Sequence, residues 1–208
     1  MLISKKRNFI FIHVYKNAGT SITCALNPFV QGRLQRMTDR ALRRINVWSP
    51  FFDTQPFHIH IKTSELIEAM VEESFNSFFS FAFVRNPWDW QVSLYRFMLK
   101  QKDHHQHLLV KRLGSFGDYI KWRCEGEVRY QKDFICSGRG ELLVDFVGRY
   151  ENIESDFNKV CSRIGVSASL PQLNVSNTQP YQQFYTDETR ELVRRTFEPD
   201  IELFEYEF

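Results

Sequence analysis

A lysine, a glycine and two hydroxyl residues stand close together near the start of the chain, in the run HVYKNAGTSI. Lys16 carries a full positive charge, while Thr20 and Ser21 carry hydrogen-bond donors. If this run leads into a helix, the first backbone N–H groups and the helix dipole also attract negative charge. The spacing therefore predicts a binding site for a phosphate or a similar anion.

A strand before this run and a helix after it would hold these groups in place. The apolar residues that follow Asn8 have the length and composition of a buried strand. We expect Gly19 to close the turn in a backbone conformation that residues with a Cβ avoid. Thr20 or Ser21 is expected to be the N-cap of a helix that continues through Leu26. The order differs from a Walker A loop, in which the lysine follows the second glycine.

A second set of residues suits a terminal phosphate. Residues 78–84 form an apolar run typical of a central parallel strand, and Pro87 is placed to begin a helix with Asp89 in its first turn. Arg85 lies between the two elements, and Ser93 lies about a turn into the helix. An arginine fork with a nearby hydroxyl binds a phosphate monoester well.

Two histidines alternate with apolar residues in the run PFHIHIK. In an extended segment His58 and His60 would leave the same face, before a helix with Thr63 or Ser64 as its N-cap. The pair can be read as metal ligands, as a general base with its neighbour, or as hydrogen-bonded groups at a sheet edge. The residues alone favour the third interpretation.

Both phosphate motifs resemble those of sulfotransferases that use 3′-phosphoadenosine-5′-phosphosulfate (PAPS). The strand, Lys-x-x-Gly-Thr-Ser and helix resemble their 5′-phosphosulfate loop, and the strand, Arg-x-Pro, helix and Ser resemble their 3′-phosphate motif. The aromatic-His-x-His run and VDFVGRYENI are similar to segments of the carbohydrate-modifying branch that includes glycosaminoglycan 2-O-sulfotransferases. The resemblance extends from Phe11 to Tyr206. The sequence departs from the family pattern at Tyr15, where Pro is common, and at Asn17-Ala18, where Thr-Gly is common.

The repeated strand-to-helix units indicate an α/β fold with a mostly parallel sheet. The resemblance implies a P-loop-like three-layer α/β/α domain, and we expect one sulfotransferase domain over residues 1–208. It also implies in-line transfer of the sulfuryl group from PAPS to a hydroxyl of an acceptor, expected to be a carbohydrate. Adenosine 3′,5′-bisphosphate would be the second product.

The resemblance also implies roles for single residues. His60 is expected to be the general base, with His58 orienting or replacing it, and Lys16 to neutralise charge at the bridging and 5′-phosphate oxygens. Arg85 and Ser93 are expected to bind the 3′-phosphate. The phosphosulfate is expected to lie on Lys16, Asn17, Ala18, Gly19, Thr20 and Ser21. No metal is expected, because the lysine and the helix N-terminus take the role that Mg²⁺ has in kinases.

Two other functions stay open at this point. A P-loop kinase or NTPase would share the strand, turn and helix, but the Gly-Lys-Ser/Thr order and a metal-holding acidic residue at a strand end are not visible in the sequence. A protein that binds a nucleotide or a glycan without catalysis would keep both phosphate motifs and could lack the histidines.

Composition limits the broader alternatives. The chain has 208 residues, of which 43% are hydrophobic and 20 are Phe, which suits one domain with a large core. The net charge of +2 contains no long block of like charge, so we expect no nucleic-acid partner. We find no signal peptide and no apolar stretch near the roughly 20 residues that span a bilayer, and we expect a cytoplasmic location. The sequence carries no signal for the oligomeric state.

Other segments give weaker signals. The four cysteines lack a C-x-x-C pair, so we expect free thiols, or a Cys124–Cys136 disulfide if the protein is exported. An amphipathic helix with a basic face is expected within residues 31–48, and DHHQH at residues 103–107 is read as a polar helix end or loop.

The segment 131–135 is similar to one that lies near the acceptor in the relatives. Polar residues that could line the cofactor are Asn174, Ser176 and Thr178. Expected helix and turn boundaries are a turn at Gly148, a helix end before Gly165 and an N-cap at Thr186.

Overall fold

The computed structural model describes residues 1–30, 59–70, 72–171 and 179–208. The chain divides into two compact units, Met1–Val84 with Phe134–Leu173, and Arg85–Asp133 with Asn174–Phe208. The predictions for the basic helix within 31–48, for His58 and for the polar residues Asn174, Ser176 and Thr178 lie outside the described residues.

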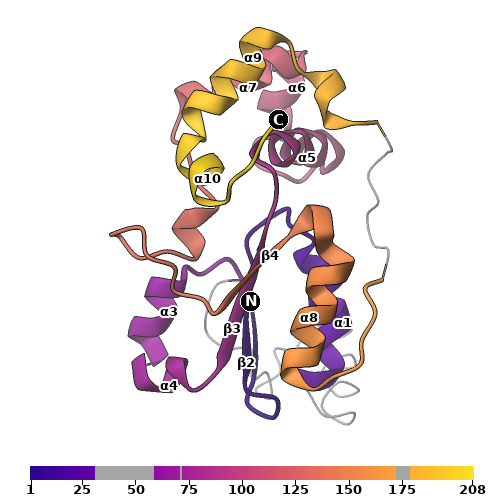
Figure 1. The fold of residues 1–208 in the computed structure, drawn as a ribbon. Helices are drawn as coiled ribbons and strands as arrows, with labels where there is room; N and C mark the ends of the chain where they lie inside the picture. The colour runs from indigo at the N-terminus through magenta and orange to yellow at the C-terminus, as the bar shows by residue number, and fades with distance from the viewer. Residues whose placement is uncertain (31–58, 71, 172–178) are drawn as a thin grey trace. The chain divides into compact units, whose positions relative to one another are not determined.

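The first unit contains the sheet. Its strands lie in the order β1-β2-β3-β4 (Figure 1), with β1 antiparallel to β2 and the other pairs parallel. The strands are β1 (Leu2–Ser4), β2 (Phe9–Ile12), β3 (Phe79–Val84) and β4 (Phe146–Arg149). Every residue of β2 is buried, as are all but the first of β3. The predicted α/β fold with a mostly parallel sheet is confirmed, and so are the two predicted buried strands.

Helices cover both faces of this sheet. Figure 1 shows α1 and α8 on one side of the strands and α3 and α4 on the other. Their bounds are α1 (Gly19–Val30), α3 (Thr63–Met70), α4 (Glu72–Asn76) and α8 (Ile153–Ile164), with a 3-10 turn η2 (Tyr150–Asn152) before α8. A core cluster joins the sheet to α1 and α8, and its largest members are Phe9, Phe11, Phe81, Phe83, Leu26 and Phe157. Alternate residues of a strand share a face, so Phe9 and Phe11 of β2 and Phe81 and Phe83 of β3 all lie on the face of the sheet that α1 covers.

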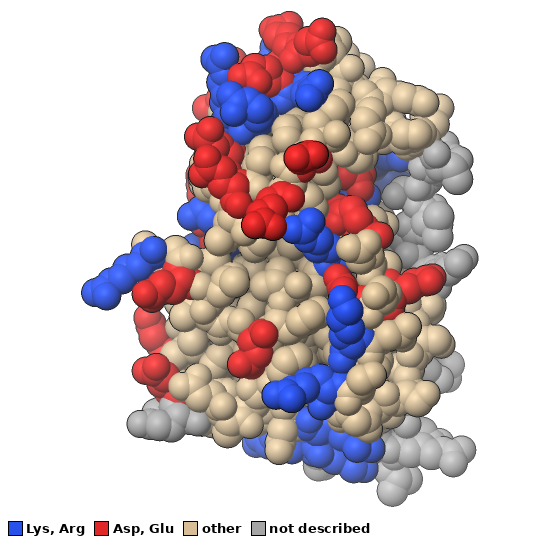
Figure 2. Space-filling model, viewed as in Figure 1, with Lys and Arg blue, Asp and Glu red and all other residues tan. Residues whose placement is uncertain are grey.

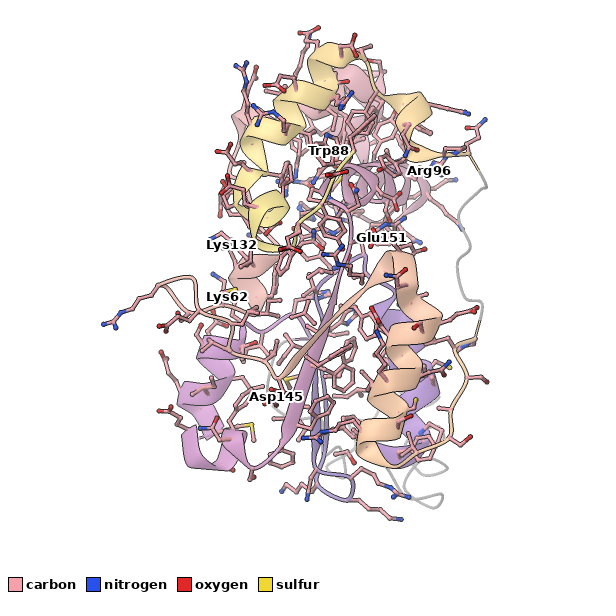
Figure 3. All side chains as sticks on the ribbon, in the orientation of Figure 1. Lys62, Trp88, Arg96, Lys132, Asp145 and Glu151 are labelled. Atoms are coloured by element: carbon pink, nitrogen blue, oxygen red, sulfur yellow. The ribbon has the colours of Figure 1, made fainter. Side chains whose placement is uncertain are left out.

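Gly148 lies inside β4 and not in the predicted turn. It pairs with Phe83 across the parallel strands, and a Cβ at this position would overlap the Phe83 ring. The start of the same strand is held by Asp145, whose Oδ2 accepts hydrogen bonds from the Ser80 N–H at 2.7 Å and the Ser80 hydroxyl at 2.8 Å (Figure 3). The predicted helix end at Gly165 is confirmed, because this residue caps α8 in the left-handed conformation.

The second unit is helical. Its helices are α5 (Pro87–Lys100), α6 (His107–Leu113), α7 (Phe116–Glu125), α9 (Asp187–Thr196) and α10 (Glu198–Leu203), with 3-10 turns η1 (Lys132–Phe134), which ends in the first unit, and η3 (Tyr181–Phe184). Helix α5 packs against α6, α7 and α9, and Trp90 meets Phe197 edge to face in the interior. Thr186 is the N-cap of α9, as predicted, and accepts a hydrogen bond from the Thr189 N–H.

The basic run of Lys5, Lys6 and Arg7 forms the exposed turn between β1 and β2. Figure 2 shows Lys and Arg gathered over this end of the first unit. The turn precedes β2, whereas Lys16 follows it, so these charges lie at the opposite end of the strand from the predicted anion site. All four cysteines fall in the described part of the chain, and none is in a disulfide. Within that part, no helix combines the length and the apolar character that crossing a membrane requires.

Candidate functional site

The loop from His13 to Ala18 joins β2 to α1 in the first unit. Helix α1 begins at Gly19, so Thr20 and Ser21 lie inside its first turn, and the prediction that one of them is the N-cap is wrong. Two other residues of the loop take the left-handed conformation, Lys16 with φ 66° and Ala18 with φ 56°. For residues with a Cβ this conformation costs roughly 1–2 kcal/mol each. The loop is therefore held in a strained shape, which is common where a backbone is arranged around a ligand.

Gly19 serves a different purpose from the one predicted. Its φ is not positive, and the turn does not depend on its conformational freedom. A Cβ at this position would instead overlap the imidazole of His13. Both residues are buried. Glycine is thus required here because the His13 ring occupies the space beside the start of α1.

The loop is tied to the carboxyl end of β3. The Asn17 side-chain amide donates to the Phe83 carbonyl at 2.8 Å, and Asn17 is almost fully buried. The Ile22 N–H donates to the Ala18 carbonyl at 3.0 Å, which closes the first turn of α1. The first N–H groups of a helix have no partner within the helix and carry partial positive charge. These contacts place the N-terminus of α1, with Lys16 beside it, at the end of the parallel strands where α/β proteins bind ligands.

His60 lies against this loop. Residues 59 and 60 form a turn before α3, so the expected alternation of an extended segment does not hold here. His60 Nδ1 lies 2.9 Å from the His13 carbonyl oxygen, and its ring centroid lies 4.6 Å from that of His13 and 5.9 Å from that of Tyr15. A carbonyl can only accept, so Nδ1 carries the hydrogen and the lone pair of the neutral ring is on Nε2. The structure therefore brings a histidine with the tautomer of a base to the loop that carries Lys16.

The helix after His60 begins one residue earlier than expected. Helix α3 starts at Thr63, and the Leu66 N–H donates to the Lys62 carbonyl, so Lys62 takes the N-cap position. The Thr63 hydroxyl donates to the Phe134 carbonyl at 2.7 Å. This contact ties the start of α3 to residue 134, and the prediction that Thr63 or Ser64 is the N-cap is wrong.

His13 is a site residue that the sequence reasoning missed. Burial is the main reason that the pKa of His13 is lowered to about 3, and the N-terminal amino group and the nearby His60 contribute to this lowering. Its ring is therefore neutral near pH 7. The Nδ1 atom of His13 is buried and has no hydrogen-bond partner among the described residues. The signal available in the sequence was a histidine placed directly after a strand that is buried at every position.

Arg85 and Ser93 lie in the second unit. Arg85 is 8% exposed, and its Nε donates to Asp89 Oδ2 at 2.7 Å, so the carboxylate orients the guanidinium. The Asn86 side chain caps α5 by accepting from the Trp88 N–H at 3.0 Å, and Pro87 begins the helix as predicted. Ser93 is buried within α5. An oriented guanidinium at the start of a helix suits an anion.

The histidines of DHHQH make local contacts. His107 Nδ1 lies 2.9 Å from the Met98 carbonyl oxygen, and His104 Nδ1 accepts from the Gln106 N–H at 3.2 Å. The His104 and His105 rings stack with centroids 4.5 Å apart. These contacts fix the connection between α5 and α6, in agreement with a polar helix end.

Comparison with known proteins gives two findings. Residues 1–207 match the model of a family described as the sulfotransferase family. A protein of Archaeoglobus fulgidus, described only as uncharacterized, is 32% identical over 97 residues, which cover 46% of this chain and 75% of that protein. The family match includes every residue discussed above as a possible ligand or base.

Proposed function

Because the chain belongs to the sulfotransferase family, we propose that it transfers the sulfuryl group of PAPS to a hydroxyl of a carbohydrate acceptor. Sulfuryl transfer in general follows from the family, whereas the donor, the acceptor and the base are our proposal. We further propose that residues 1–208 act as a single sulfotransferase domain, closest to the branch of the glycosaminoglycan 2-O-sulfotransferases.

The observation that carries the proposal is the contact between His60 and the loop after β2. One short segment supplies Lys16, the N-terminus of α1 and the carbonyl oxygen that lies 2.9 Å from His60 Nδ1. The transfer of a sulfuryl group from an anionic donor to a hydroxyl requires positive charge that binds the donor and a base that takes the proton of the hydroxyl. The loop and His60 place these two groups side by side. A protein that only binds a nucleotide has no need of the oriented histidine.

The donor fits the groups that the loop provides. PAPS supplies the sulfuryl group to be transferred and a 3′-phosphate by which it can be held. We assign the phosphosulfate to the backbone of residues 16–19 and to the hydroxyls of Thr20 and Ser21, with Lys16 neutralising the charge that grows on the 5′-phosphate side. Transfer of this kind depends mainly on positioning and on charge stabilisation. The proposal needs no metal ion, because Lys16 and the N–H groups at the start of α1 supply positive charge.

We assign His60 as the general base. Its Nε2 would take the proton of the acceptor hydroxyl, and the hydrogen bond from Nδ1 to the His13 carbonyl would stabilise the imidazolium that forms. His58 remains a second candidate that orients or replaces His60. Arg85 and Ser93 are assigned to the 3′-phosphate, for which the ion pair of the buried Arg85 with Asp89 offers an oriented guanidinium.

The test is incubation with PAPS and a panel of hydroxylated carbohydrates, followed by mass spectrometry for a sulfate adduct. We expect an adduct without Mg²⁺, and a large loss of it in His60→Ala. A second arm measures thermal stability with adenosine 3′,5′-bisphosphate and with ATP, and we expect stabilisation by the first only. Equal stabilisation by ATP with a strict need for Mg²⁺ would favour a kinase, and binding of the bisphosphate without any transfer would favour a protein that binds nucleotides without catalysis.

A further inference from the structure

The backbone of Arg85 is held on both sides by one side chain of the second unit. Gln131 Oε1 accepts from the Arg85 N–H at 2.9 Å, and Gln131 Nε2 donates to the Arg85 carbonyl at 2.7 Å. Arg85 lies between the end of β3 and the start of α5, so its backbone groups need partners from outside these elements. Gln131 is fully buried and supplies both.

Gln131 is itself held by a carboxylate. Asp200 Oδ2 accepts from the Gln131 N–H at 2.7 Å, and Asp200 Oδ1 accepts from the Lys132 N–H at 2.9 Å. Figure 3 labels Lys132 on the chain segment that meets α10. Asp200 is fully buried within α10, and both of its oxygens are used. Burying a carboxylate costs free energy of folding unless its oxygens accept hydrogen bonds, as both oxygens of Asp200 do.

The Arg85 side chain is anchored at its far end as well. Asp89 holds Nε at 2.7 Å, while Gln131 holds the peptide groups on either side of the Cα. Recognition of a phosphate by arginine depends on the direction of two parallel N–H bonds. In enzyme sites a shift of about 1 Å in a positioned group can lower the reaction rate about 10²-fold. Anchors at both ends define where the guanidinium lies.

We propose that Gln131 and Asp200 are positioning residues that set the place of Arg85 for the 3′-phosphate of the donor. The inference rests on the proposed function, because it takes Arg85 as the ligand of that phosphate. Neither residue touches the nucleotide in this proposal. Asp200 fixes the backbone at Gln131, Gln131 fixes the backbone at Arg85, and Asp89 then directs the guanidinium.

The test compares the dissociation constants of adenosine 3′,5′-bisphosphate and adenosine 5′-phosphate, because their ratio isolates the contribution of the 3′-phosphate. We expect Arg85→Ala to abolish most of the preference for the bisphosphate. Gln131→Leu should reduce the preference about tenfold or more and leave affinity for the monophosphate nearly unchanged. Asp200→Asn, which keeps one acceptor oxygen, should reduce it less.

The matched control is Tyr119→Phe. Tyr119 is also fully buried in the second unit, and its hydroxyl donates to Gln91 at 3.3 Å, so the variant loses a buried hydrogen bond that does not involve Arg85. We expect Tyr119→Phe to lower the melting temperature and to keep the preference for the bisphosphate. If Gln131 has only a structural role, Gln131→Leu should likewise lower the melting temperature and keep the preference for the bisphosphate.

Two further measurements keep the test decisive. Amide hydrogen exchange at Arg85, measured without nucleotide, should be faster in Gln131→Leu than in the wild type. If Gln131→Leu does not fold, Gln131→Glu replaces it, since the carboxylate still accepts from Arg85 N–H but cannot donate to its carbonyl. Should the wild type bind both nucleotides alike, the proposed function and this inference fall together. If the wild type discriminates and the folded Gln131 and Asp200 variants discriminate equally well, only this inference is wrong.

Discussion

The imidazole of His13 fills the space that a Cβ atom on Gly19 would need. The same histidine holds His60 through its backbone carbonyl at 2.9 Å. The start of α1 and the candidate base are therefore connected through one buried residue, His13, by its ring and by its backbone carbonyl. A change at residue 19 should reach His60 through His13.

Gly19→Ala should lower turnover and destabilise the protein by about 1–3 kcal/mol, because the added methyl displaces the His13 ring. The measurement is urea unfolding together with the rate of sulfate transfer. Gly117→Ala is the matched control, since a Cβ there would meet its neighbours only at ordinary contact distances. In the first turn of α7 this control should be neutral or stabilising by up to about 1 kcal/mol. Equal effects of the two changes would contradict the role given to Gly19.

His60→Ala should lower kcat by roughly 10²- to 10⁴-fold and leave the affinity for adenosine 3′,5′-bisphosphate nearly intact, because a base acts in proton transfer and not in nucleotide binding. Steady-state kinetics and calorimetric titration measure the two effects separately. His58→Ala should cost less. A larger loss in His58→Ala would reverse the two roles, and normal turnover in the double variant would assign the base to another group.

His13→Gln should change how stability depends on pH. The pKa of His13 in the folded protein is about 3, below its ordinary value of about 6.5, so the unfolded chain binds more protons between these two values. The wild type should therefore lose stability relative to the variant as the pH falls below about 6.5, by at most about 1.4 kcal/mol per pH unit. Urea unfolding at several pH values measures this difference. The exposed His105, changed to Gln, serves as the control for the replacement of a histidine by glutamine as such.

The titration of Asp200 should change the stability of the protein with pH in the direction opposite to that of His13. Burial raises the pKa of Asp200 to about 6 from its ordinary value of about 3.8, so the folded protein binds its proton more tightly than the unfolded chain does. The stability of the wild type should fall relative to Asp200→Asn as the pH rises from about 4 to about 6, by roughly 2–3 kcal/mol in total. Because His13 is present in both proteins, its own titration cancels in the comparison. A difference that stays constant with pH would show that Asp200 is ionised as easily in the folded protein as in the unfolded one.

Local patterns in the sequence were sufficient for much of the fold. The apolar runs after Asn8 and from residue 78 are strands, Pro87 begins α5, and Thr186 caps α9. Each of these features depends on residues within a few positions of one another, where backbone preferences act directly. A helix after Lys16 is also predicted and found, although it begins at Gly19 and neither Thr20 nor Ser21 is its N-cap.

The features that the sequence did not reveal depend on distant partners. The sequence predicts that Gly19 closes a turn, but the neighbour that requires a glycine there is the ring of His13. The sequence likewise predicts a turn at Gly148, but this residue lies opposite Phe83 in the sheet. The alternation at His60 suggested a strand, while the actual constraint is a hydrogen bond to the His13 carbonyl. A glycine required for close packing and a glycine required for a turn look alike until the neighbouring strand is known.

The hydrogen bonds that fix Arg85 also determine when its site can form during synthesis. Gln131 lies 46 positions after Arg85, and Asp200 lies another 69 positions further along the chain. Because a nascent chain leaves the ribosome from its N-terminus, the loop after β2 emerges long before α10 does. On a ribosome stalled before residue 200, Arg85 would lack the carboxylate that secures its partner Gln131. If Arg85 binds the 3′-phosphate as we propose, nucleotide would stabilise the chain through this contact only after α10 has been made, and not during the early stages of folding.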